Sequence, residues 1–252
     1  MPANRLGEAV WVWNAAWGRP FGTATQWVAL PADQAVALPA QVSLEVGACL
    51  GIPALTAYHA VAVNGGVAGK RVLIAGGAGA VGHYALQCAR QMGASQIITT
   101  VSSAEKAAVA SAAGADLVVN YKSENVTDRI RQATAGQGVD RIIEVDIAAN
   151  MLTDLAVTTP TGEIIVYGSG QPNVSIPFYP AILNNVTLHF FMVYRLSPAD
   201  RMRAIAALTA MLAANTLQHQ IAARLPLERI AEAHELVETG QANGNVILDV
   251  GH

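Results

Sequence analysis

Short apolar runs and helical segments alternate along residues 71–194 of this 252-residue chain. Six runs have strand length and are rich in β-branched or aromatic residues. They are RVLIAG (71–76), QIITTV (96–101), DLVVNY (116–121), DRIIEV (140–145), EIIVYG (163–168) and VTLHFFMVY (186–194). Helix-forming residues fill the segments between them, at 80–94, 104–115, 124–138 and 150–162. This order predicts right-handed βαβ crossovers, and therefore an α/β fold with a doubly wound parallel sheet.

The first 45 or so residues have a different pattern. The stretches EAVWVWNAAW (8–17) and TATQWVALPADQAVALP (23–39) alternate apolar and polar positions and contain turn residues. Alternation of this kind is typical of antiparallel β-structure. We therefore expect a second, smaller unit at the N-terminus.

Composition narrows the class of protein. Hydrophobic residues make up 52% of the chain and charged residues 13%, which is ample for a buried core. The net charge of −3 and the lack of a Lys/Arg cluster predict neither nucleic-acid nor membrane binding. The N-terminus lacks the pattern of a signal peptide, so a cytoplasmic protein is expected. Two cysteines, Cys49 and Cys88, are too few for a disulfide framework.

A glycine-rich turn follows the first of the six runs. Gly77, Gly79 and Gly82 have the spacing G-x-G-x-x-G, between a predicted strand and a predicted helix. Glycines in this position allow a tight turn and a close approach of a pyrophosphate to the N–H groups of the helix. The alternative is a tight strand-to-helix turn that binds nothing.

The end of the second run favours one dinucleotide over the other. An NAD site usually has Asp or Glu there to hold the ribose hydroxyls, but this chain reads ITTVSSAEK. Ser102, Ser103 and Lys106 leave room for a 2′-phosphate and supply donors to it, so NADP(H) is predicted. Two alternatives stay open: the serines cap the next helix, or Glu105 holds the ribose.

Several motifs together resemble a known family. They are LGIPALTAYHAV (50–61), AGGAGAVG (75–82), GVDRIIEVDIAANM (138–151), GEIIVYGSG (162–170) and LPLERIAEAHELVETGQANGNVIL (225–248). In this order they resemble the zeta-crystallin-like quinone oxidoreductase branch of the medium-chain dehydrogenase/reductase superfamily, from about Gly7 onward. The resemblance implies a Rossmann domain at 47–200 and a partial GroES-like β domain formed by 1–46 with 201–252. It also implies hydride transfer from NADPH to a quinone or related α,β-unsaturated carbonyl, without a metal, and a homodimer.

The resemblance assigns cofactor-binding residues by their place in the motifs. Those implied near the pyrophosphate and the adenosine half are Ala78, Gly79, Ala80, Val81, Ser102, Lys106, Tyr121 and Asn150. Those implied near the nicotinamide are Tyr167, Gly168, Ser169, Gly170, Phe190, Phe191 and Met192. Without the resemblance, Tyr121 is a strand-end residue and the Phe-Phe-Met run is a core segment.

The resemblance to the family also has implications for metal binding and catalysis. Zinc-dependent members of the superfamily carry a cysteine ligand four residues before the threonine of a T-x-Y segment. Thr56 and Tyr58 match that segment, and Ile52 stands in the ligand position. Isoleucine cannot bind zinc. Thr56 is the one polar candidate for a catalytic role, and its alternative is a helix residue bonded to its own backbone.

The similarity to the family begins at Gly7-Glu8-Ala9-Val10, which match a strand of the family's N-terminal catalytic domain. The resemblance therefore implies that most of that domain is absent. The tryptophan-bearing strands would then expose apolar area and open edges, so association through that surface or a rearranged N-terminal region is predicted. Two functions remain open: an NADPH-dependent quinone or enone reductase, and a catalytically weak, crystallin-like NADP(H)-binding protein.

Overall fold

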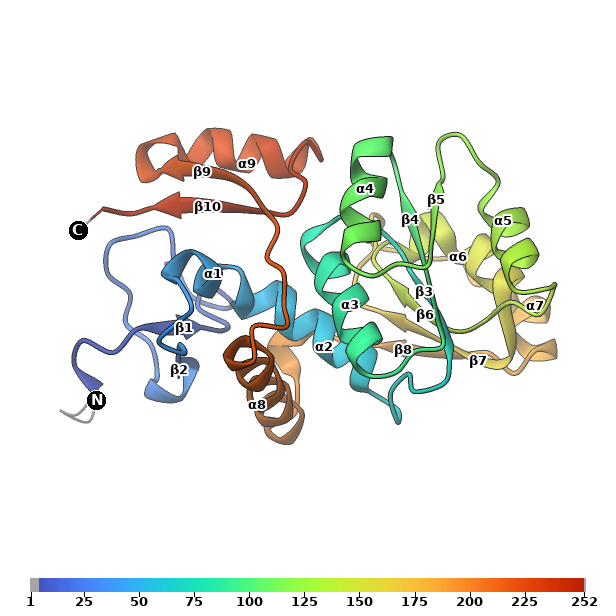
Figure 1. Ribbon diagram of the computed structural model, residues 1–252, viewed down its shortest axis with the longest axis horizontal. Coiled ribbons are helices and arrows are strands. Elements are labelled where there is room, and N and C mark those ends of the chain that lie inside the picture. The colour runs from blue at the N-terminus through green and yellow to red at the C-terminus, as the bar shows by residue number, and fades with distance from the viewer. Residues whose placement is uncertain (1–4, 252) are drawn as a thin grey trace. The chain divides into compact units, whose positions relative to one another are not determined.

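The computed structural model describes residues 5–251, and the chain divides into two compact units (Figure 1). One unit is Thr56–Arg195. The other combines the residues up to Leu55 with those from Leu196 onward. The sequence places the boundaries of the family domains at 46/47 and 200/201, and that assignment stays a prediction.

A six-stranded parallel sheet forms the centre of the unit Thr56–Arg195, in the order β5-β4-β3-β6-β7-β8. Its strands are β3 (Arg71–Ile74), β4 (Gln96–Val101), β5 (Leu117–Asn120), β6 (Val139–Glu144), β7 (Thr158–Val166) and β8 (Thr187–Phe190). Each lies within one of the six apolar runs or overlaps most of it, so the predicted doubly wound sheet is confirmed; β7 begins earlier than its run, at Thr158, so residues 158–162 are strand, whereas the sequence predicts helix there. The strand order reverses between β3 and β6, which is where such sheets bind ligands.

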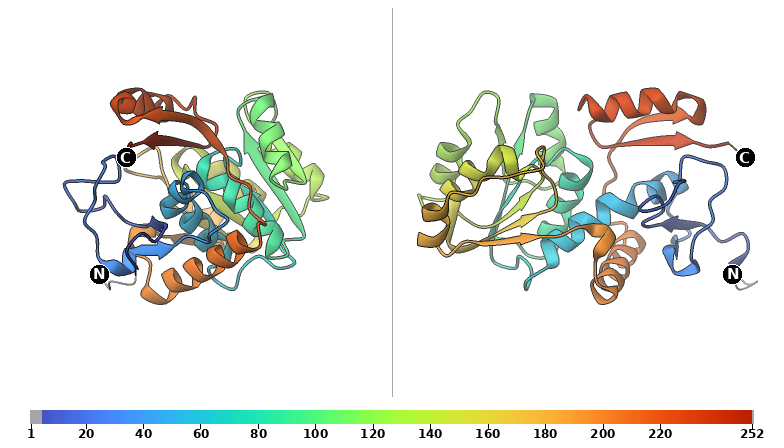
Figure 2. Two further views of the ribbon diagram at one scale, coloured as in Figure 1. Left: turned by 60° about the vertical axis from the view of Figure 1, so that its left-hand side comes forward. Right: turned by 180° about the vertical axis from the view of Figure 1, so that it is seen from behind.

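Helices cover both faces of this sheet (Figures 1 and 2). They are α2 (Leu55–Ala62), α3 (Ala80–Gln91), α4 (Ala104–Ala112), α5 (Val126–Ala133), α6 (Ile147–Val157) and α7 (Phe178–Leu183), with a 3₁₀ turn η4 (Val193–Arg195). Three of them begin at a side-chain cap: Ser103 before α4, Asn125 before α5 and Asp146 before α6 each accept a backbone N–H three residues later. Such caps satisfy donors that the first helical turn leaves without partners.

One face of the sheet packs against α5 and α6. Leu73, Ile98 and Ile142 from the strands lie in one cluster with Ile130 of α5 and Met151 of α6, and all five are buried. The alternate strand residues point to the opposite face, because successive side chains of a strand alternate. Burial of both faces explains why the strands read as continuous apolar runs.

A buried arginine holds the end of α2 against the sheet. Arg141, at the start of β6, is fully buried, and it donates to the carbonyl oxygens of Val61 at 3.0 Å, Val63 at 2.8 Å and Asn64 at 3.3 Å. Its guanidinium also forms an ion pair with Glu163 of β7. Carbonyl groups at the last turn of a helix lack partners within it, and Arg141 supplies them together with a favourable charge.

The second unit contains mostly short elements and one sixteen-residue helix. They are β1 (Val10–Val12), β2 (Ala35–Ala37), β9 (Ile221–Pro226), β10 (Asn245–Asp249), α1 (Leu44–Ala48), α8 (Pro198–Ala213), α9 (Ile230–Glu238), the 3₁₀ turns η2 (Ala32–Gln34) and η5 (Leu227–Arg229), and a π-helical turn η3 (Leu50–Ala54). β1 and β2 are antiparallel, whereas β9 and β10 are parallel. No helix within residues 5–251 is long and apolar enough to cross a membrane.

The predicted antiparallel β-structure at the N-terminus is smaller than the pattern suggests. Its two stretches of ten and more residues contain only three paired residues each. Trp11 is buried within β1 and Trp13 lies 4.0 Å from the guanidinium of Arg201, whereas Trp17 and Trp27 are exposed. The alternating pattern therefore located two antiparallel strands but overstated their length, because strand pairing also requires a partner in register. Association through this surface stays a prediction.

Candidate functional site

The glycine-rich turn joins β3 to α3 with very little room around it. Gly76 has φ of +70°, a left-handed conformation that favours glycine. A Cβ on Gly77 would lie 2.2 Å from the Thr99 hydroxyl, and one on Gly82 would lie 2.2 Å from the Gly76 carbonyl oxygen. The glycines are therefore required for the packing of the turn itself, as the spacing predicts.

Two threonines of β4 fix this turn. The Thr99 hydroxyl donates to the Ile74 carbonyl at 2.6 Å, and the Thr100 hydroxyl accepts from the Gly76 N–H at 3.2 Å. The Gly77 N–H donates to the Thr100 carbonyl, also at 3.2 Å. The turn is thus held from the neighbouring strand, which sequence reasoning did not foresee.

A cavity of about 320 Å³ opens beside the turn and brings together half of the predicted residues. The predicted residues that line it are Ala78, Gly79, Ala80, Val81, Ser102, Lys106, Tyr121 and Tyr167. Gly79 precedes α3 and has no side chain to accept the N–H groups of the first turn. The N-terminal end of a twelve-residue helix, with its partial positive charge, therefore faces this cavity.

The end of β4 combines a helix cap with part of the cavity lining. Ser103 accepts the backbone N–H of Lys106 at 3.2 Å, so the capping alternative is confirmed for Ser103. Ser102 and Lys106 both line the 320 Å³ cavity, and Glu105 is not part of that lining. The arrangement therefore offers a hydroxyl and an ammonium group at the end of the cavity where an NAD site would have a carboxylate.

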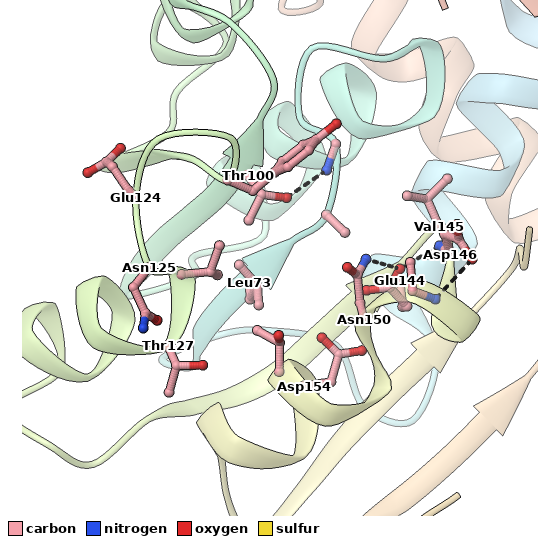
Figure 3. A pocket seen from close by; sticks show the side chains of 16 residues that line it. Leu73, Thr100, Glu124, Asn125, Thr127, Glu144, Val145, Asp146, Asn150 and Asp154 are labelled. Atoms are coloured by element: carbon pink, nitrogen blue, oxygen red, sulfur yellow. Dashed lines mark hydrogen bonds between the residues drawn. The ribbon is translucent and has the colours of Figure 1, made fainter. Parts of the chain in front are cut away.

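A second cavity, of about 510 Å³, lies between the start of α5 and α6 (Figure 3). Tyr121, which also lines the first cavity, and the predicted residue Asn150 belong to its lining. Figure 3 shows Asn150 bonded to Glu144; its amide donates to Glu144 Oε1 at 3.0 Å. The Asn150 side chain therefore holds the buried carboxylate of Glu144, a role that the sequence did not suggest.

Two buried carboxyl groups form the base of this second cavity. Glu144 is fully buried and Asp154 is 1% exposed, and Glu144 Oε2 and Asp154 Oδ2 are buried oxygens that accept no hydrogen bond from the described residues. Burial, and then the charge of Glu144, raise the pKa of Asp154 to about 9. Burial also raises the pKa of Glu144, against the hydrogen bonds from Asn150 and Asp146. Because two buried charged carboxylates repel each other, the raised pKa values favour one proton retained by the pair, with Asp154 the more strongly shifted group.

A third cavity, of about 470 Å³, gathers most of the residues predicted near the nicotinamide. The predicted residues in its lining are Tyr167, Gly168, Ser169, Phe190, Phe191 and Met192. Phe191 is held by its N–H bond to the Val166 carbonyl at 3.1 Å and by ring contacts with Tyr167 and His59. Phe190 and Met192 are 59% and 43% exposed, so the alternative that the Phe-Phe-Met run is core is wrong for these two.

Two predicted residues stand apart from these linings. Gly170 lines none of the three cavities, although its N–H is bonded to Asp146, which lines the second one. Thr56 is buried on α2 and also lines none of them. All three cavities lie within the unit Thr56–Arg195.

Known proteins share this architecture. Residues 80–210 match the family model described as "Zinc-binding dehydrogenase". A quinone oxidoreductase of Pongo abelii is 33% identical over 223 residues, which are 87% of this chain and 67% of that relative. The chain belongs to the zinc-binding dehydrogenase family, within the medium-chain dehydrogenase/reductases. The resemblance noted from the sequence is thereby confirmed.

Solved structures of the same superfamily share the fold of this chain. An NAD-dependent alcohol dehydrogenase superposes with a TM-score of 0.83 at 28% identity, covering 91% of this chain and 66% of that structure. A quinone oxidoreductase of Escherichia coli, solved in complex with NADPH, has a TM-score of 0.78 at 25% identity and covers 86% and 68%. The chain thus spans about two thirds of the length of these relatives.

The family's name raises the question of a zinc site. Within residues 5–251, no three His, Cys, Asp or Glu side chains lie together in a group that could hold a metal ion. The residue in the predicted ligand position, Ile52, offers no donor atom. The side chains of residues 5–251 therefore do not fit a zinc ion.

Proposed function

We propose that this chain is an oxidoreductase that binds NADP(H) and passes a hydride from NADPH to a quinone or a related α,β-unsaturated carbonyl. One observation carries the proposal: the 320 Å³ cavity joins the start of α3, Ser102, Lys106 and Tyr121 at the point where the strand order reverses. A helix N-terminus suits a pyrophosphate. A serine and a lysine beside it suit a further phosphate on the ribose.

The chain's own residues would bind and orient the cofactor. Gly79 leaves the α3 N–H groups open to the pyrophosphate, and the second cavity adjoins the first at Tyr121, where the adenosine half would lie. The segment Gly168–Gly170 and Phe191 would border the nicotinamide. Bound NADPH supplies the hydride, and a proton from solvent completes reduction of the quinone to hydroquinone. Rate acceleration would come from orientation of the two reactants.

The first experiment compares NADPH with NADH. The purified chain is titrated with each, and the nicotinamide fluorescence is followed for the wild type, Lys106→Ala and the control Lys122→Ala. Lys122 is an exposed lysine that follows Tyr121 but lines none of the three cavities. We expect Lys106→Ala to weaken NADPH binding about tenfold, which is about 1.4 kcal/mol, and to leave NADH binding and the control unchanged.

The second experiment tests catalysis. p-Benzoquinone is added to the NADPH complex while the nicotinamide absorbance is measured. Oxidation faster than without protein supports the reductase. Binding without oxidation would instead support the catalytically weak NADP(H)-binding protein. Absence of NADPH binding by the wild type, or an equal effect of Lys106→Ala on NADH and NADPH, would contradict the proposed cofactor site.

A further inference from the structure

The side chain of Asp146 connects the loop after β6 to the loop after β7. Its Oδ1 accepts the Gly170 N–H at 2.7 Å, and the same oxygen accepts the Ala149 N–H at 3.4 Å as the cap of α6. The approach of the two loops is close: a Cβ on Gly170 would lie 2.8 Å from Asp146 Oδ2. Asp146 therefore contacts the backbone of Gly170, and a larger residue at position 170 would displace the Asp146 carboxylate.

Backbone bonds hold the start of the second loop, and Asp146 holds its end. The Tyr167 N–H donates to the Glu144 carbonyl at 3.1 Å, and the Ile147 N–H donates to the Gly168 carbonyl at 3.3 Å. Beyond Gly168, the bond from the Gly170 N–H to Asp146 is the contact that joins this segment to the β6 loop. The direction of the backbone at residues 169–170 thus depends on one carboxylate.

We infer that Asp146 is a positioning residue for the segment Gly168–Gly170 and, through it, for the nicotinamide half of the cofactor; this rests on the proposed function. A hydrogen bond to an ionised carboxylate is about twice as strong as a neutral one. A binding segment must keep its groups within about 0.5 Å of the productive position. Asp146 provides that constraint through its bond to the backbone N–H of Gly170.

The test separates the two halves of the cofactor. Affinities for NADPH and for adenosine 2′,5′-bisphosphate, which lacks the nicotinamide, are measured for the wild type, Asp146→Ala and Asp146→Asn. Ser197→Ala is the matched control, because Ser197 caps α8 in the other unit in the same way. We expect Asp146→Ala to weaken NADPH binding about tenfold and bisphosphate binding less than twofold, as lost orientation affects one half only. Asp146→Asn keeps an acceptor oxygen and should restore most of the affinity.

A second measurement needs no cofactor. Hydrogen exchange of the peptide that contains Gly170 should be faster in Asp146→Ala than in the wild type, and unchanged in Ser197→Ala. If Asp146→Ala does not fold, Gly170→Ala breaks the same bond from the other side and should give the same split of affinities.

Different results would overturn the role of Asp146 and the proposed function. An equal loss of both affinities in Asp146→Ala, or unchanged exchange at Gly170, would overturn this inference while the wild type still binds NADPH. Failure of the wild type to bind either ligand would overturn the proposed function instead.

Discussion

The buried pair of Glu144 and Asp154 makes the stability of this chain depend on pH in a specific direction. Burial and the neighbouring carboxylate raise the pKa of Asp154 from 3.8 to about 9. Between these values the folded chain keeps a proton that the unfolded chain releases. The contribution of Asp154 is therefore most favourable in acid and is lost progressively as the pH rises toward 9.

The magnitude follows from the distance between the two pKa values. Neutral pH lies roughly three units above the pKa of Asp154 in the unfolded chain, and each unit corresponds to about 1.4 kcal/mol. Retaining the proton in the folded chain therefore costs about 4 kcal/mol near neutral pH. In Asp154→Asn, an amide donates to Glu144 with no proton uptake. We expect this variant to be about 2–4 kcal/mol more stable than the wild type near neutral pH, since the amide fits less well than the carboxyl.

The assay is urea denaturation at several pH values between about 5 and 9. The free energy of unfolding should fall with pH in the wild type and fall less steeply in Asp154→Asn, where only the raised pKa of Glu144 remains, with the two curves converging in acid. Asp116→Asn is the control, because Asp116 pairs with Arg90 at the surface and should not change the slope in this range. Lower stability of Asp154→Asn at every pH, with the wild-type slope retained, would show that the pair holds no proton.

Two other predictions concern the ion pair of β6 and the glycine turn. Glu163→Gln should destabilise the chain by about 3 kcal/mol in denaturation, because it leaves the buried Arg141 without its counter-charge. Burial opposes ionisation of Glu163, but the bond and charge of Arg141 outweigh it and keep its pKa below the ordinary value, so the wild type alone should lose this stability as the pH falls below about 4.5. Gly82→Ala should lower the melting temperature, because its Cβ meets the Gly76 carbonyl at 2.2 Å. Gly79→Ala, whose nearest contact is 3.3 Å, should retain the melting temperature and weaken NADPH binding; equal melting temperatures for both variants would contradict the steric argument.

The sequence predicted the sheet well because its information there is local. A strand buried on both faces must be apolar throughout, and G-x-G-x-x-G marks the turn where a helix starts. Runs such as 71–76 and 140–145 therefore gave the strands β3 and β6 almost residue by residue. Ser102 and Lys106 could be placed from the end of the second run, whereas Tyr121 and Tyr167 were assigned by the family resemblance alone.

Contacts between distant segments were not predictable in this way. Thr99 and Thr100 look like ordinary strand residues, and their bonds to the turn depend on the register of β4 against β3. The bond between Asp146 and Gly170 joins loops 24 positions apart. No local pattern shows that a carboxylate in one loop will meet an N–H of another.

The residues that hold the glycine turn against β4 are different from those that are proposed to select the cofactor. Thr99 and Thr100 hold the turn through Ile74 and the backbone of the loop, whereas Ser102 and Lys106 lie beyond Val101 and make none of those bonds. Substitutions at positions 102 and 106 should therefore leave the phosphate-facing backbone in place. In evolutionary terms, the proposed preference for a phosphorylated ribose could be gained or lost by a few changes at one strand end, without rebuilding the fold around it.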